Sequence, residues 1–135
     1  MNTSEWAAQL FKVTPRATRD DFPSVILDLD ATQKFVEIQV LWEFDNPDAS
    51  TVLIRGLESA ERHWDAAATT FHQLQECFLY PKVVGGGRIK HDSVSQTILI
   101  YGSSVEYGQA NFERVMELCR EAFPGYSVSY HQSGY

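Results

Sequence analysis

The chain contains 135 residues, a length that suits one domain and leaves little room for two. Its 18 acidic and 11 basic side chains give a net charge of −7, which argues against a nucleic-acid-binding protein, because such proteins usually present a basic surface. No apolar run is long enough to span a bilayer, and no secretory signal pattern opens the chain, so we expect a cytoplasmic protein with no membrane partner.

The N-terminal part of the chain is expected to be less ordered than the rest. Residues 1–22 lack a sustained hydrophobic period, so we predict a loose arm there and a single folded domain over residues 23–135. The β-prone segment Ser24–Asp30 predicts a first strand, and a turn is expected at Ala31–Gln33.

The clearest alternation of apolar and polar residues runs from Lys34 to Phe44 and predicts a strand with one apolar face. Lys34 lies at the start of that face, whereas Glu37 and Gln39 fall on the opposite one. A turn cluster follows, and the segment Thr51–Gly56 predicts a strand that returns antiparallel. The apolar face consists of Val36, Ile38, Val40 and Trp42.

Two helices are predicted in the second half of the chain, each from apolar residues spaced three and four apart. The first has Ser59 as its expected N-cap, within a few residues, and the second runs from about Gln109 to Ala122. The apolar stripe of the first helix consists of Ala60, Trp64, Ala67, Phe71, Leu74 and Phe78, and that of the second of Phe112, Val115, Leu118, Cys119 and Ala122.

Between and after the helices the sequence predicts further strands. "PKVVGGGRIKHD" surrounds three glycines, "SVSQ" forms a turn, and "TILIYGSS" and "YSVSY" are β-prone. Antiparallel returns with two interspersed helices predict an α/β (α+β) domain, with a mixed sheet of about six strands flanked by two main helices.

Neither cysteines nor histidines are arranged for a metal. Cys77 and Cys119 fall within apolar helical patterns, which favours two reduced, half-buried thiols over a disulfide framework. No Cys/His cluster has zinc spacing, and no pair of histidines shares a helical face with an acid, so we expect no metal and no other cofactor.

Of the four histidines, His63 has the most favourable setting for chemistry. It is expected in the first turn of a helix, where unpaired N–H groups attract anions and the positive end of the helix dipole keeps an imidazole neutral. His91, nearer the glycines, is a weaker second candidate. His72 and His131 are assigned no role.

Two glycine-bearing segments are open to two interpretations each. Gly85–Gly87 lack the Walker and dinucleotide spacings and suggest a bulged or tight connection, or else let a main chain approach His63 closely with Arg88 alongside. "YGSSVEYG", Tyr101–Gly108, is either an ordinary strand-to-helix connection or a nest of N–H groups that binds an anion, with Ser104 as a further donor.

Several motifs together resemble one known family. "IRG" is followed by a histidine seven residues past its glycine, and then by "GGGRI-x-H", "YG-x-S-x-x-YG", "FPGY" and a terminal "GY". In this order they resemble the Janus/ocnus family of phosphohistidine phosphatases over roughly residues 34–135. The resemblance implies a mixed sheet flanked by helices and a metal-independent hydrolase. Its partners would be phosphohistidine-containing proteins or peptides, with phospholysine as a further option, and a domain of this size is expected to be a monomer.

The resemblance also assigns roles to individual positions. His63 would be the catalytic histidine, as general base or nucleophile, and Lys34 the substrate-binding lysine. Arg55 and Arg88 fall where the family keeps arginines close to the phosphate. The phosphate-binding loop would consist of Ser104, Val105 and Glu106, and a carbonyl of Gly85, Gly86 or Gly87 is the expected partner for the second ring nitrogen of the histidine.

This sequence departs from the family pattern at three positions. Ser103 stands where an aromatic residue is common, Glu106 where a small residue is common, and Phe112 where a histidine is common. A carboxylate directed at a phosphate would weaken its binding, unless the loop binds through main-chain N–H groups. Two alternatives therefore remain: a non-catalytic family member that binds a phosphorylated partner, and a small scaffold protein outside the family.

Overall fold

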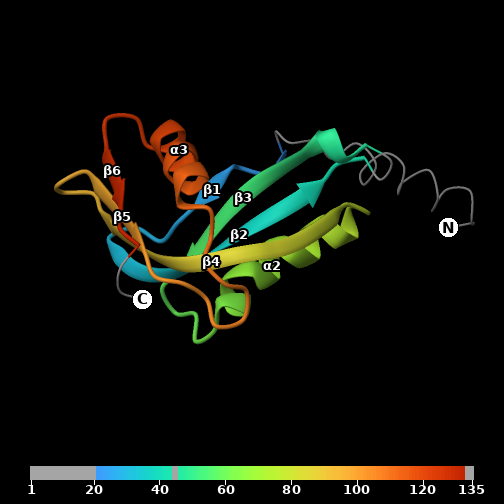
Figure 1. The fold of residues 1–135 in the computed structure, drawn as a ribbon, viewed down its shortest axis with the longest axis horizontal. Helices are drawn as coiled ribbons and strands as arrows, with labels where there is room; N and C mark the ends of the chain where they lie inside the picture. The colour runs from blue at the N-terminus through green and yellow to red at the C-terminus, as the bar shows by residue number, and fades with distance from the viewer. Residues whose placement is uncertain (1–20, 44–45, 133–135) are drawn as a thin grey trace, which may run out of the picture.

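A computed structural model describes residues 21–43 and 46–132 (Figure 1). The predicted N-terminal arm lies outside the described residues except for its last two positions. The elements, in chain order, are β1 (Val25–Ile26), β2 (Ala31–Leu41), the short 3₁₀ helix η2 (Pro47–Ala49), β3 (Ser50–Leu57), α2 (His63–Glu76), β4 (Tyr80–Asp92), β5 (Thr97–Tyr101), α3 (Phe112–Ala122) and β6 (Ser127–Tyr130).

The strands form one mixed sheet in the order β1-β3-β2-β4-β5-β6. The four inner strands pair antiparallel, whereas each edge strand pairs parallel to its neighbour. α2 packs against β2, β3 and β4, and α3 packs against β5 and β6. Because α3 also reaches β1 at the other end of the strand order, the sheet curls around this helix (Figure 1). The predicted fold, a mixed six-stranded sheet with two main helices, is confirmed.

Each face of the sheet carries its own hydrophobic core. Val36, Ile38 and Val40 pack under α2, as the alternation of β2 predicts. On the opposite face, Phe35 packs under α3, together with isoleucines of β3, β4 and β5. Glu37, which the alternation assigns to the face opposite the apolar row, lies on the α3 side and is buried there. Alternation predicted which face each residue occupies, but not that both faces are covered.

The first predicted strand is too long, and the turn after it is misplaced. Only Val25 and Ile26 pair with β3, and the turn lies at Leu29–Asp30, so that Ala31 already begins β2. The side chain of Gln33 accepts a hydrogen bond from the backbone N–H of Asp28 and donates one to its C=O, at 2.7 and 2.9 Å. These bonds satisfy backbone groups that would otherwise need a partner strand.

α2 begins later than predicted, and its buried face is rotated. The carboxylate of Asp65 accepts the N–H groups of Glu61 and Arg62, so Arg62, and not Ser59, is the N-cap. Within the predicted stripe, Ala67 and Leu74 are buried, whereas Phe78 is 63% exposed. His63, Ala66 and Thr70 share the buried face. The later start places His63 at the first helical position.

α3 also begins later than predicted, at Phe112, because the side chain of Asn111 accepts the N–H of Arg114 and caps the helix. Phe112, Val115 and Cys119 are buried, as the predicted stripe requires, whereas Ala122 is exposed. Cys119 and the half-buried Cys77 are free thiols, and burial raises the pKa of Cys119 to about 12. Among the described residues, no helix is long and apolar enough to cross a membrane.

The three glycines lie inside the long strand β4, beside a bulge, and not in a tight turn. Glu37 pairs with Gly85 and Ile38 with Val83, so one extra β4 residue is inserted between these pairs. β5 pairs with β4 only from Arg88 onward, and the free edge of Gly86 bonds instead to the chain before α3. Gly86 donates to Gly108 O at 3.0 Å and accepts from Ala110 N at 3.1 Å. The glycines thus give the chain from 108 to 110 room to reach the sheet.

Replacement of Gly86 by alanine tests this packing. Alanine normally stabilises a strand relative to glycine, but here its methyl group would lie 2.8 Å from Phe35 O, 2.9 Å from His63 Cδ2 and 3.2 Å from Ser104 Cβ. Because a sheet carbonyl cannot move aside, we expect Gly86→Ala to lower the free energy of unfolding by about 1–3 kcal/mol, measured by urea denaturation.

Lys90→Ala is the matched control, because Lys90 lies on the same strand and is exposed. Its free energy of unfolding should change by less than about 0.5 kcal/mol. Equal stability of the two variants would mean that the close approach at Gly86 is not a constraint on the fold.

Candidate active site

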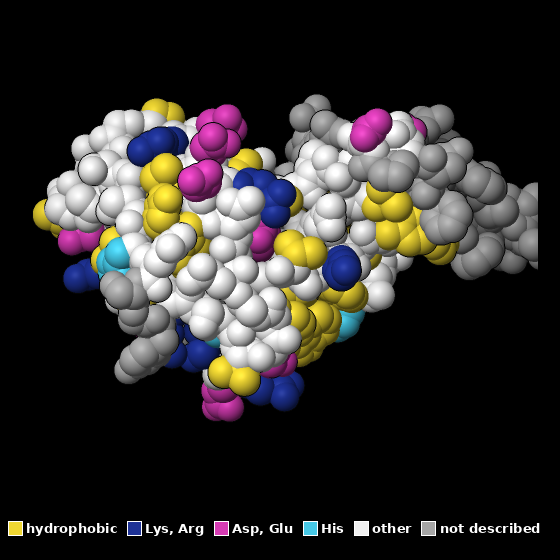
Figure 2. All heavy atoms as spheres, viewed as in Figure 1, with side chains coloured by type: hydrophobic (Ala, Val, Ile, Leu, Met, Phe, Trp, Pro, Cys, Tyr) yellow, Lys and Arg dark blue, Asp and Glu magenta, His cyan; other side chains and the backbone are white. Residues whose placement is uncertain are grey.

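One cleft contains His63 together with most of the charged residues that the sequence analysis selected. It has a volume of about 500 Å³ and is lined by Lys34, Glu61, Arg62, His63, Arg88, Ser103, Val105 and Glu106. These residues come from β2, β4, the start of α2 and the loop between β5 and α3. In Figure 2, basic and acidic side chains gather at the lower edge of the molecule, where Figure 1 places that loop and the turn before α2.

His63 is held by one hydrogen bond to the glycine strand. Its Nε2 lies 3.0 Å from Gly87 O, and because a carbonyl only accepts, Nε2 carries a proton. The residue is 6% exposed. Among the described residues, Nε2 of His91 is the only side-chain nitrogen or oxygen that is both fully buried and without a hydrogen-bond partner. Nδ1 of His63 makes no hydrogen bond there, so it is not fully buried and is not sealed from solvent. In the neutral ring Nδ1 therefore carries a lone pair that a cleft ligand can reach.

The surroundings of His63 favour its neutral form. Burial lowers the pKa of His63, and the positive charges of Lys34 and Arg88 lower it further. The hydrogen bond to Gly87 and the negative charge of Glu106 act in the opposite direction but do not outweigh burial. Since the ordinary histidine pKa is about 6.5, the ring is neutral at pH 7, as a base or nucleophile must be.

Lys34 and Arg88 supply positive charge from adjacent strands. They are directly paired across β2 and β4, so their side chains emerge on the same face of the sheet. The ammonium group of Lys34 donates to Ala60 O at 3.4 Å, in the turn that leads into α2. This contact directs the lysine toward the start of the helix, and both cations line the cleft beside His63.

The loop of Ser104, Val105 and Glu106 is closed by its own hydrogen bonds. Ser104 and Gly108 exchange two backbone bonds, at 3.1 and 2.8 Å, and Ser104 Oγ accepts the N–H of Tyr107. Ser104 is buried and its N–H is already bonded to Gly108 O, so of its two predicted donors only the hydroxyl proton has no acceptor among the described residues. The N–H groups of Val105 and Glu106 donate to no acceptor among the described residues, and both residues line the cleft. They are the candidate anion donors of this loop.

The structure does not bring Arg55 into the cleft. It is 4% exposed, and its guanidinium donates to Thr70 Oγ1 at 2.8 Å and to Ile54 O at 2.8 Å. Burial lowers its pKa to about 10, so it keeps its positive charge at pH 7. Arg55 connects β3 to α2 from behind the cleft, and the expectation that it contacts phosphate does not fit this position.

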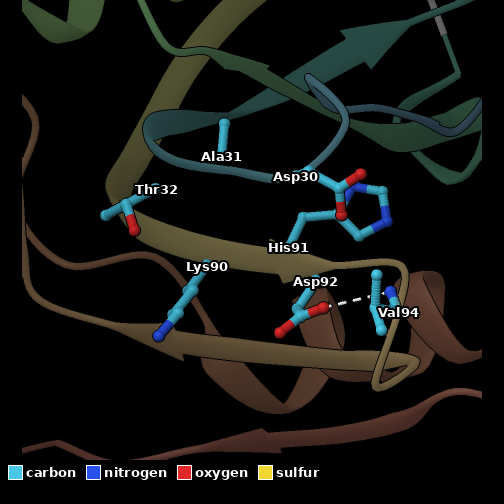
Figure 3. Close-up of a pocket in the computed structure, with 7 residues that line it drawn as sticks. All are labelled: Asp30, Ala31, Thr32, Lys90, His91, Asp92 and Val94. Atoms are coloured by element: carbon cyan, nitrogen blue, oxygen red, sulfur yellow. Dashed lines mark hydrogen bonds between the residues drawn. The ribbon is translucent and has the colours of Figure 1, made fainter.

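A second pocket, of about 320 Å³, surrounds the weaker candidate His91 (Figure 3). His91 Nδ1 lies 3.1 Å from Asp28 O, and its ring packs against Phe123 and Tyr126. The carboxylates of this pocket are already occupied, because Asp30 accepts Ser93 N–H and Oγ–H. Asp92 accepts the N–H of Val94, the dashed bond in Figure 3. His91 Nε2 is buried and has no hydrogen-bond partner among the described residues, and the acids beside it are bonded within the two turns that this pocket connects.

Two cleft residues, Glu61 and Arg62, were missed by the sequence analysis. They directly precede His63, and this position was the only feature of the sequence that could have indicated them. Because the helix was predicted to start at Ser59, both residues were assigned to the helix and not to the turn that lines the cleft. Of the departures noted above, Ser103 and Glu106 line the cleft. Phe112 does not: it is the first residue of α3, is buried in the core between this helix and the sheet, and packs edge-on against Tyr130, with ring centroids 5.7 Å apart.

The arrangement combines a neutral imidazole with groups that can bind an anion. The ring faces a cleft lined by three basic and two acidic side chains, and two N–H groups there have no acceptor among the described residues. Among the described residues, no group of three or more His, Cys, Asp or Glu side chains is placed to hold a metal ion. The geometry meets the requirements for a base or nucleophile next to fixed donors.

Comparison with known proteins finds relatives that match most of the chain. The model of the Janus/Ocnus family (Ocnus) matches residues 19–127. The 14 kDa phosphohistidine phosphatase of Sus scrofa is 32% identical over 117 residues, covering 84% of this chain and 92% of the relative. The human 14 kDa phosphohistidine phosphatase is 33% identical over 116 residues, covering 84% and 93%.

A differently named relative matches almost as widely. The sex-regulated protein janus-A of Drosophila melanogaster is 28% identical over 113 residues, covering 84% of this chain and 82% of the relative. The family match spans most of the chain, and the relatives above 30% identity are covered almost completely. This chain belongs to the Janus/Ocnus family.

Proposed function

We propose that this protein hydrolyses the P–N bond of phosphohistidine in proteins or peptides, without a metal ion. The observation that carries the proposal is the hydrogen bond from His63 Nε2 to Gly87 O, which leaves Nδ1 as the reactive nitrogen of a neutral ring in a cation-lined cleft. Two relatives, at 32% and 33% identity, are named phosphohistidine phosphatases, which supports the same substrate class.

Nδ1 of His63 can act in either of two balanced ways. As a nucleophile it bonds to phosphorus while the P–N bond breaks, and the bond electrons return to the leaving imidazole nitrogen, which takes a proton from solvent. Water then displaces the phosphoryl group from Nδ1 and releases inorganic phosphate. As a general base Nδ1 takes a proton from water while that water attacks phosphorus and the P–N bond breaks, and the bond electrons stay with the leaving imidazole nitrogen. The leaving nitrogen then takes a proton from solvent, and His63 returns its own added proton to solvent.

The other cleft groups fit the charge of such a reaction. The transition state of phosphoryl transfer is loose, and its charge spreads over three equatorial oxygens. Lys34, Arg88 and the N–H groups of Val105 and Glu106 are donors fixed by the sheet and by the closed loop, so they need little reorganisation when charge develops. Glu106 lies in the same cleft, and its carboxylate must turn away from the phosphoryl group for binding to be favourable.

A second function is a phosphoprotein-binding module that does not turn over its ligand. The observation in its favour is that Phe112 stands where a histidine is common in the family, so an assisting imidazole is missing at that position. Relatives named janus-A rather than phosphatase are compatible with this reading. Binding of a phosphohistidine peptide without phosphate release would select it.

Removal of the imidazole is the direct test of catalysis. We expect His63→Ala to lower the rate of phosphate release from a phosphohistidine peptide by about a hundredfold or more, because both routes require Nδ1. A metal chelator should leave the rate of the unmodified protein unchanged. Phosphate release is measured directly, and circular dichroism checks that each variant is folded.

His72→Ala is the matched control, because His72 lies on the same helix and is exposed. Its rate should stay within about twofold of the parent. A His63→Ala variant that retains full activity would exclude the proposed mechanism, and a rate abolished by the chelator would assign the chemistry to a metal.

A rapid-quench experiment separates the nucleophile from the base. If Nδ1 attacks phosphorus, labelled phosphate should appear on His63 as an acid-labile adduct that forms and decays fast enough to account for turnover. If Nδ1 only activates water, no such adduct should accumulate at any quench time.

Glu106 should set both the affinity for phosphate and the acid limb of the pH profile. Glu106→Gln removes a negative charge from the cleft, so we expect inorganic phosphate to inhibit about two- to fivefold more tightly. The negative charge of Glu106 raises the pKa of His63, so its removal should lower that pKa further. Because the neutral ring is the active form, activity falls as the pH drops through this pKa, and the fall should shift to lower pH in the variant.

Glu117→Gln, on the exposed side of α3, removes the same charge away from the cleft and should change neither quantity. The gain in phosphate affinity should shrink at high salt, because exposed charges are screened. An acid limb that stays in place in Glu106→Gln would show that this carboxylate does not influence the histidine.

A further inference from the structure

A buried carboxylate lies in the middle of the sheet, on the face opposite the cleft. Glu37 of β2 is 1% exposed. Both of its oxygens are engaged by the start of α3. Oε1 accepts the N–H of Asn111 at 3.1 Å, and Oε2 accepts Nε of Arg114 at 2.7 Å and forms an ion pair with its Nη2.

This pairing explains how a charge can be buried there. An isolated carboxylate in a protein interior is strongly unfavourable, whereas a fork of guanidinium donors satisfies it in a fixed geometry. The side chain of Arg114 is 44% exposed, so the pair spans the boundary between core and solvent. Replacement of a buried ion pair by apolar side chains is often neutral for stability, so stability alone gives no reason for a charged pair at this position.

The chain that Glu37 anchors leads directly to the cleft. Going backward from Asn111, Ala110 donates to Gly86 O, and Gly86 donates to Gly108 O. Gly108 then exchanges two hydrogen bonds with Ser104, which closes the loop that carries Val105 and Glu106. The segment 104–111 is therefore held at three successive points: the loop closure, the edge of β4, and Glu37.

These attachments carry the segment from one face of the sheet to the other. Glu37 is paired with Gly85 and faces α3, and a methyl group on Gly85 would meet the backbone of Ala110. One residue further along β4, a methyl group on Gly86 would meet both His63 and Ser104. The segment thus passes the edge of β4 at the glycines and reaches the histidine on the α2 side.

We infer that the Glu37–Arg114 ion pair is a positioning device for the loop of Val105 and Glu106. By fixing the start of α3 on the sheet, the pair fixes where the two donor N–H groups of that loop stand relative to His63. Glu37 and Arg114 line neither the cleft nor its rim, so they are not catalytic residues. The consequence for turnover rests on the proposed function, but the positioning of the loop does not.

Amide hydrogen exchange measures the positioning without any substrate. The reporters are four N–H groups that make backbone hydrogen bonds along this path: those of Ser104, Gly108 and Ala110 in the segment, and that of Gly86, which bonds to Gly108 O. In Glu37→Gln the side chain keeps its shape but loses the charge that Arg114 and Asn111 bind. We expect exchange at these four amides to accelerate about tenfold, with amides of the β2–β3 pairing unchanged.

A double variant avoids leaving one charge of the pair buried without its partner, which would destabilise the protein. Glu37→Leu combined with Arg114→Leu replaces the pair by apolar side chains, an exchange that is often neutral for stability. Its thermal midpoint should stay close to that of the parent while the four reporter amides still exchange about tenfold faster. In the phosphatase assay its KM should rise about tenfold with a smaller change in kcat, since donor placement is lost and His63 is kept.

Glu113→Gln is the control, because it removes an exposed acid from the same first turn of α3. It should leave exchange and KM unchanged. The inference is wrong if the exchange rates of the four amides in both the double variant and Glu37→Gln lie within twofold of those in this control. The ion pair would then only stabilise the fold. If the parent protein releases no phosphate, the proposed function is wrong but the positioning inference is not affected. The amide-exchange rates of the variants would still decide whether the ion pair positions the loop.

Discussion

The site depends on the contact between the ring of His63 and the carbonyl of Gly87. That hydrogen bond selects the tautomer, because the carbonyl can only accept and thereby keeps the proton on Nε2. It leaves Nδ1 as the free nitrogen and holds the ring against the sheet. The contact requires three conditions at once: a helix that begins at His63, a strand without a side chain at Gly86, and a register that presents Gly87 O to the helix.

The three glycines of β4 make room for several neighbouring groups and not only for His63. Gly85 gives room to the backbone of Ala110, Gly86 to His63 and Ser104, and Gly87 to Tyr101 O and the ring of Phe35. Each therefore has its own neighbour, and together they form the place where β4, α2 and the segment before α3 meet. The strand pays for this with backbone entropy, which the surrounding hydrogen bonds and packing must offset. The bulge at the same point adjusts the direction of the strand beside the site.

Charge in this protein is organised locally rather than globally. The chain as a whole carries −7, yet Lys34, Arg62 and Arg88 meet at one cleft. A cleft can have a positive field in an acidic protein because nearby charges dominate and distant ones are screened within about 10 Å. Burial lowers the pKa of His63, and the charges of Lys34 and Arg88 lower it further, so the ring stays neutral. Glu37 lies on the opposite face of the sheet and forms an ion pair with Arg114. Its negative charge is therefore compensated locally and contributes little to the electric field in the cleft.

The sequence by itself determined the type of fold and the order of its main elements, and it singled out His63, which lines the cleft. Alternation in β2 and helical spacing in α3 are local patterns, and they predicted which residues face each core. The motifs around His63, the glycines and the loop before α3 were sufficient to suggest the family, and Lys34 and Arg88 lie in the cleft as expected.

Only the tertiary structure decided which backbone groups remain unbonded and which side chains are enclosed. Whether the N–H of Ser104 or that of Val105 is left without an acceptor depends on Gly108, and the burial of Arg55 depends on Thr70 of a packed helix. The start of α2 depends on which carboxylate reaches the free N–H groups, and the burial of Glu37 depends on where α3 covers the sheet. Such outcomes arise from contacts between residues distant in sequence, and local periodicity carries no information about those contacts.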